Sequence, residues 1–95
     1  MRKEQIDAWI FLSISEKPGK LDKIIEIADV INHAIPTYNE LQNSLNWLIS
    51  NKFITKIAKS YKYTEKGKEL RDKANKKKGS IFKVWEFIEK TFRKL

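Results

Sequence analysis

Apolar residues recur every three or four positions through the first half of the chain, and this spacing predicts three helices. The segment between the first two contains Pro18 and Gly19, which both interrupt helices. A second break precedes Pro36, which fixes the direction in which the chain enters the third helix. The expected helices cover residues 3–14, 21–32 and 37–51.

The third helix has the clearest start signal. Thr37 and Glu40 stand at the spacing of a capping box, in which each side chain accepts a hydrogen bond from the backbone N–H of the other residue. Helical spacing then predicts one apolar stripe and, opposite it, a polar face rich in asparagine. The expected stripe is Leu41, Leu45, Leu48 and Lys52.

The period of the pattern changes after residue 52. Residues 53–57 and 61–64 are rich in β-branched and aromatic side chains and partly alternate with polar ones. This pattern predicts a short hairpin with its turn at 58–60. Because the turn contains neither Asn-Gly nor Asp-Gly, its type is not readable from the sequence.

Two more helices are expected after the hairpin. The fourth begins behind Thr64 as N-cap, is densely charged, and ends near Lys78 with Gly79 in the C′ position. The fifth begins at Ser80 and carries a wide apolar stripe. The sequence therefore predicts a mainly α protein with a small two-stranded β-hairpin (α+β). We expect a domain over 1–79 and an added helix over 80–95.

Length and composition favour one small globular domain with one core. The chain has 95 residues, 41% of them hydrophobic and 34% charged, and no cysteine. The absence of cysteine excludes disulfides, thiolate metal sites and cysteine nucleophiles. The single histidine, His33, has no second ligand beside it in the sequence, so a structural role at a helix end is expected for it.

The sequence carries no signature of an enzyme. Its three glycines are scattered, so no phosphate-binding loop is present, and its carboxylates alternate with lysines as they do on solvated helix faces. We therefore expect no catalytic activity, no cofactor and no metal. The N-terminal residues lack the pattern of a signal peptide, and no apolar run approaches the roughly 20 residues that span a bilayer. A cytoplasmic location without a membrane partner is expected.

The net charge of +8 is distributed unevenly along the chain. Residues 1–50 carry five Lys/Arg against seven Asp/Glu, whereas residues 51–95 carry fifteen against five. Such an asymmetry favours a polyanionic partner, with nucleic acid first and an anionic membrane surface second. The alternative is a lysine-rich surface that only keeps the protein soluble.

Two segments resemble MarR-like and PadR-like bacterial transcription regulators. They are residues 45–54, Leu-Asn-Trp-Leu-Ile-Ser-Asn-Lys-Phe-Ile, and residues 61–67, Tyr-Lys-Tyr-Thr-Glu-Lys-Gly. The order of the expected elements is also similar to that of these winged helix-turn-helix proteins, in which a hairpin, the wing, follows the third helix. The chain departs from the family at 50–52, where a glycine is usual.

The resemblance implies that the third helix enters the major groove of double-stranded DNA and that the wing touches the DNA backbone or the minor groove. Asparagine and glutamine pair with adenine, residues at a helix N-terminus bind phosphate, and lysines of the wing release counterions. The DNA-binding residues expected on this basis are Thr37, Tyr38, Asn39, Gln42, Asn43, Asn46, Lys56, Lys59 and Lys62.

One observation opposes DNA binding. The segment 37–51 contains no lysine or arginine, although arginine to guanine is the commonest specific contact. Two alternatives therefore remain: weaker or nonspecific nucleic-acid binding, and a winged helix that serves as a protein–protein interaction module.

The fifth helix is expected to form a homodimer interface, because its stripe is wider than a small core requires and regulators of this class dimerise through terminal helices. The alternative is that it packs on the first helix of its own chain. The expected interface residues are Ile81, Trp85, Ile88 and Phe92, with Trp9 from the first helix.

Overall fold

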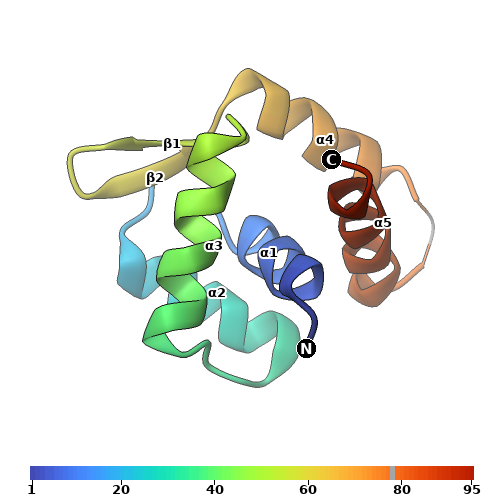
Figure 1. Cartoon of the computed structure of the whole chain (residues 1–95), viewed down its shortest axis with the longest axis horizontal. Helices are drawn as coiled ribbons and strands as arrows, with labels where there is room; N and C mark the ends of the chain where they lie inside the picture. Colours follow the sequence, from blue (N-terminus) through green and yellow to red (C-terminus); the bar gives the residue numbers. More distant parts are fainter. Residues whose placement is uncertain (78) are drawn as a thin grey trace.

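The computed structural model describes residues 1–77 and 79–95 as five helices and one two-stranded antiparallel sheet (Figure 1). The mainly helical α+β fold expected from the sequence is confirmed at this level. The elements are α1 (Lys3–Leu12), α2 (Leu21–Asn32), α3 (Tyr38–Ser50), β1 (Ile54–Ile57), β2 (Ser60–Tyr63), α4 (Glu65–Asn75) and α5 (Ile81–Arg93).

Helix α1 is the centre of the molecule. It lies between α3 on one side and α5 on the other, and α2 packs against it as well (Figure 1). The five consecutive residues from Ala8 to Leu12 are each 0–2% exposed. A helical segment that is buried on all its faces cannot be amphipathic, which explains why apolar residues run without interruption from Ala8 to Leu12.

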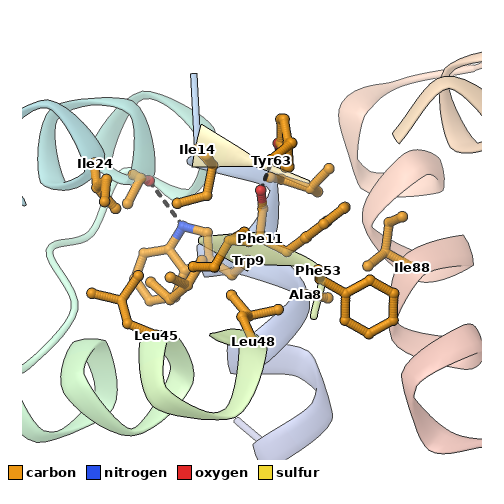
Figure 2. Packing of buried hydrophobic residues seen from close by; sticks show 14 of the residues in the cluster. Ala8, Trp9, Phe11, Ile14, Ile24, Leu45, Leu48, Phe53, Tyr63 and Ile88 are labelled. Carbon is orange, nitrogen blue, oxygen red and sulfur yellow. Dashed lines mark hydrogen bonds between the residues drawn. The ribbon is translucent and has the colours of Figure 1, made fainter. Parts of the chain in front are cut away.

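Two hydrogen bonds inside the core join α1 to neighbouring elements (Figure 2). The indole N–H of Trp9 donates to the carbonyl of Ala28 in α2 at 3.0 Å, and the hydroxyl of Tyr63 in β2 donates to the carbonyl of Phe11 at 2.6 Å. Burial raises the pKa of the Tyr63 phenol above its usual range, more than the nearby charge of Arg71 lowers it, so the group stays a neutral donor.

The hairpin has a two-residue turn, and its second strand is hydrogen-bonded to the connection between α1 and α2. Ile54 pairs with Tyr63 and Ile57 with Ser60, so Ser60 belongs to the strand and not to the turn expected at 58–60. Ala58, the first turn residue, has φ 56°, the left-handed region that type II′ turns require at this position. Tyr61 also exchanges two backbone hydrogen bonds with Gly19, of 2.8 and 3.1 Å, which holds β2 against the α1–α2 connection.

The chain leaves α3 through a Schellman motif. The N–H of Phe53 donates to the carbonyl of Leu48, and the N–H of Lys52 donates to that of Ile49, both at 3.0 Å. Lys52 is the C′ residue, with φ 65°, and its side chain is exposed. Its expected place in the leucine stripe is therefore wrong, because the helix ends before it and the left-handed turn directs it outward.

Helix α4 begins on this corner and is shorter than expected. The hydroxyl of Thr64 caps the helix by accepting from Gly67 N–H at 3.1 Å, and it donates to the carbonyl of Lys52 at 2.5 Å. The helix ends at Asn75, so Gly79, with φ 128°, is not its C′ residue. The expected end at Lys78 lies outside the described residues.

Helix α5 packs on α1 and completes the core of its own chain. This arrangement is the one that the sequence analysis gave as the alternative to a dimer interface. Ile88 and Phe92 are 0% and 2% exposed, and Trp85 stacks on Trp9 with ring centroids 6.1 Å apart. The indole N–H of Trp85 also donates to the carbonyl of Gln5 at 2.8 Å. Trp85, Ile88, Phe92 and Trp9 are thus buried within one chain, and the homodimer interface expected at these residues stays a prediction. Ile81 is half-buried and also packs against the core.

We expect Lys52→Gly to raise the free energy of unfolding by about 0.5–1 kcal/mol, because glycine adopts the left-handed conformation without the steric cost that a Cβ imposes. Urea unfolding followed by circular dichroism measures the difference. Lys52→Ala is the control, since it removes the same charge but keeps the Cβ. An equal gain from alanine would assign the effect to charge.

We expect Gly67→Ala to destabilise the protein by about 1–3 kcal/mol. A Cβ at Gly67 would lie 1.9 Å from the carbonyl oxygen of Phe53, so α4 must move off the corner that it caps. The same substitution at an exposed helical site normally stabilises by roughly 1 kcal/mol, so even the sign of the change is diagnostic. Thermal unfolding beside the exposed Lys68→Ala variant tests it.

Candidate nucleic-acid interface

The outward face of α3 carries the polar residues that the sequence placed there. Three leucines, Leu41, Leu45 and Leu48, hold the opposite side in the core with 0–3% exposure. The helix is therefore fixed in rotation, and its polar face is presented to solvent. The exposed residues of this face, called the amide face below, are Asn39, Asn43, Asn46 and Ser50, with Gln42 half-buried at its edge.

The start of α3 is held by the expected capping box. Glu40 N–H donates to Thr37 Oγ1 at 3.1 Å, and Thr37 N–H donates to Glu40 Oε1 at 2.9 Å. Thr37 is thereby used within the helix end, whereas Tyr38 is 74% exposed beside the helix N-terminus. The expected placement of both residues at the N-terminal end of α3 is confirmed, and phosphate binding by them stays a prediction.

A buried ionic contact, which sequence reasoning missed, ties α3 to α1. Asp7 is 2% exposed; its Oδ1 accepts from the Ser44 hydroxyl at 2.8 Å and its Oδ2 from the Lys3 ammonium at 2.5 Å. Asp7 and Ser44 are 37 residues apart, so no local pattern joins them. The only signal in the sequence is an acidic residue one helical turn before the apolar Ile10 and Phe11.

Lys3 of α1 lies beside the flank of α3 that faces α1. Its Nζ stands 4.4 Å from the centroid of the Trp47 ring on α3, on the flank away from the hairpin. A groove of about 440 Å³ runs between α1 and α3 at this point. It is lined by Lys3, Ile6, Asp7, Asn39, Glu40, Asn43 and Ser44.

The three lysines expected in the wing do not share a face of the hairpin. Lys56 pairs with Tyr61, and its Nζ lies 5.6 Å from that ring, on the side of the hairpin that packs inward. Lys62 pairs with Thr55 and lies on the other side, because successive side chains of a strand alternate. Lys56 and Lys59 instead line a groove with Lys20 at the start of α2.

Other lysines gather at the C-terminal end of α3. Lys66 donates to the carbonyl of Asn51 at 2.9 Å and lies 4.4 Å above the ring of Phe53. A groove there, next to the outer face of the hairpin, is lined by Ile49, Lys52, Ile54, Thr55, Thr64, Glu65 and Lys66. Lys52 was missed by sequence reasoning because its position depends on the left-handed corner.

The other part of the basic excess of residues 51–95 follows the hairpin, mostly on α4 and α5. With Gly67 and Ala74 buried, helical spacing puts Glu65, Glu69 and Asp72 on the outermost side of α4, with basic residues on both flanks. On α5, Lys90 pairs with Glu86 at 3.0 Å and Arg93 with Glu89. The hydrogen bond and charge of Lys90 lower the pKa of the Glu86 carboxyl. These two helices therefore present mixed charge.

Within residues 1–77 and 79–95, no three His, Cys, Asp or Glu side chains come together in a way that would hold a metal ion. None of the helices described is both long and apolar enough to cross a membrane. His33 is exposed at the end of α2, where its backbone N–H donates to the carbonyl of Asp29 at 2.6 Å.

Comparison of the chain with protein-family models, with curated proteins and with solved structures found no match. The resemblance to MarR-like and PadR-like regulators therefore stays a prediction from residues 45–54 and 61–67.

We expect Ser44→Ala to lower the free energy of unfolding by about 1–3 kcal/mol, because the buried Asp7 carboxylate loses one of its two donors. Ser50→Ala, on the exposed side of the same helix, is the matched control and is expected to change stability by less than about 0.5 kcal/mol. Urea unfolding of both variants gives the comparison. Equal effects would mean that the Asp7–Ser44 contact does not stabilise the packing of α3 on α1.

Proposed function

We propose that this chain is a winged-helix protein that binds double-stranded DNA, with α3 in the major groove and the β1–β2 hairpin as the wing. The amide face of α3 carries this proposal. Its side chains point into solvent from a helix whose orientation is fixed by a leucine stripe, a capping box and the Asp7–Ser44 contact. Such rigidity is what positions a recognition surface within the tolerance of base pairing.

The chemistry of the amide face fits adenine. An asparagine side chain pairs bidentately with adenine N6 and N7, through one acceptor and one donor. Asn39 and Asn46 are seven residues apart on the helix, which is about 10 Å along its axis and spans roughly three base pairs. The proposal therefore includes a preference for adenine at two or three adjacent positions.

The attraction to the phosphate backbone is assigned to lysines outside α3. Lys52 and Lys66 stand at its C-terminal end, and Lys62 projects from the outer face of the hairpin beside them. Each phosphate contact of this kind releases counterions and strengthens binding regardless of sequence. At the other end, Tyr38 lies where the helix N-terminus itself favours a phosphate oxygen.

The protein is proposed to act by binding and not by catalysis. The candidate site consists of amides and a hydroxyl, which neither take up nor release protons near neutral pH. Transcription regulation is the role that the resemblance implies.

A second function, protein–protein interaction, is favoured by one observation. Three large apolar side chains are exposed around the α2–α3 connection: Val30 at 71%, Ile35 at 67% and Tyr38 at 74%. Contact with water does not stabilise such side chains, so a cluster of them is typical of a protein-binding surface. DNA is placed first because the amide face is flanked by cations. A Val30→Ser/Ile35→Ser variant that keeps DNA binding but loses a partner protein would reverse this order.

Fluorescence anisotropy of labelled duplexes tests DNA binding, first with random sequence at low salt and then with a sequence selected from a random library. We expect the selected duplex to bind more tightly than random duplex. Asn43→Ala should remove about 1–3 kcal/mol of this discrimination, because its amide is lost from the base edges. Asn75→Ala on α4, also exposed, is the control and should change nothing. No binding even at low salt would overturn the proposal.

A further inference from the structure

A helix lying in the major groove has a DNA strand along each of its two flanks. The helix with its side chains is about 10–12 Å across, and the groove is about 12 Å wide, so both sugar–phosphate walls come within reach of the residues beside the helix. One flank of α3 faces the hairpin and its lysines. The other flank faces the groove between α3 and α1, where the second strand has to run.

Lys3 is placed to meet that second strand. It comes from α1, yet it lines the same groove as Asn39 and Asn43 of the amide face. The helix α3 has no lysine or arginine of its own between Tyr38 and Ser50. The cation on this side must therefore come from another element.

We propose that the ammonium group of Lys3 binds a phosphate of the DNA strand on the α1 flank of α3, so that the two strands are held from opposite sides. This inference rests on the proposed DNA binding. It adds a contact from α1, whereas the function proposed above uses only α3, the hairpin and the start of α4.

The contacts of Lys3 hold its head group in place without using all of its donors. An ammonium has three N–H donors. One is taken by Asp7 Oδ2 at 2.5 Å, and the Trp47 ring supports another side of the group at 4.4 Å. The side chain is still 61% exposed, so donor capacity remains for a phosphate oxygen. Because the lysine is already ordered, less side-chain entropy is lost on binding.

Two carboxylates lie in the same groove and set the net attraction. Asp7 is buried behind Lys3 and shared with Ser44, so it faces the protein. Glu40 is half-buried and is engaged by the backbone of Thr37 in the capping box. Glu40→Gln keeps a side chain that can cap the helix and removes the negative charge, so this variant is expected to bind DNA more tightly.

The salt dependence of binding is the first test. Lys3→Met should reduce the slope of log K against log[salt] by about 0.9, which corresponds to a roughly 3.5-fold smaller loss of affinity between 50 and 200 mM salt. Lys3→Arg should keep the slope. Lys90→Met is the matched control, because Lys90, like Lys3, pairs with a carboxylate one helical turn away and is 60% exposed, but lies on the outer side of α5. Circular dichroism confirms that each variant is folded.

A positional test does not depend on affinity. The chain has no cysteine, so a single cysteine can carry an iron chelate that cleaves nearby DNA. A probe at Arg2→Cys, next to Lys3, should cut one strand beside the amide-contacted bases, and a probe at Lys62→Cys should cut the opposite strand. A probe at Lys90→Cys should cut neither.

The outcomes separate the two proposals. If the wild-type protein binds DNA and Asn43→Ala weakens its sequence preference, but Lys3→Met leaves the salt slope unchanged, the role of Lys3 is overturned and DNA binding stands. Cutting of the same strand from residues 2 and 62 would also overturn it. If the wild-type protein binds no DNA at low salt, both proposals fall.

Discussion

The burial of the C-terminal half of α1 on all sides is the constraint from which the rest of the structure follows. The residues from Ala8 to Leu12 are covered completely because separate elements, α2, α3 and α5, pack on α1. Tyr63 of the hairpin adds a hydrogen bond to its backbone. The positions of the surrounding elements are thus set by their packing on α1, and this packing also fixes the orientation of the amide face of α3.

The division of α3 into a buried and an exposed side separates stability from recognition. Its leucines and Ser44 contact α1 and the core, whereas its asparagines make no contribution that the core needs. Residues of the amide face are therefore free to vary with a target while the fold is retained. The positive charge near the amide face does not come from α3 itself. The cations beside this face come from α1, the corner after α3, the hairpin and the start of α4.

Local patterns in the sequence were sufficient to predict the elements but not their tertiary contacts. The capping box of Thr37 and Glu40 and the change of period after residue 52 depend on neighbours within a few residues, and both were predicted correctly. The Asp7–Ser44 contact joins positions that only the fold brings together, so no spacing could reveal it. From the sequence alone, the stripe of α5 is assigned to a partner subunit, because amphipathicity shows that a helix face is covered but does not show which element covers it. Lys52 was misplaced because helical periodicity was extended one residue beyond the Schellman corner.

The contact of α5 with α1 has a consequence for how the chain acquires its structure during synthesis. The hydrogen bond from Trp85 to Gln5 spans 80 residues, so the two ends of the described fold are among the last parts to find each other. Until residues 81–93 have left the ribosome, the face of α1 that they cover stays exposed to water and to chaperones. The nascent chain therefore cannot complete its core one element at a time, and completion of the core is expected to wait until α5 has emerged from the ribosome.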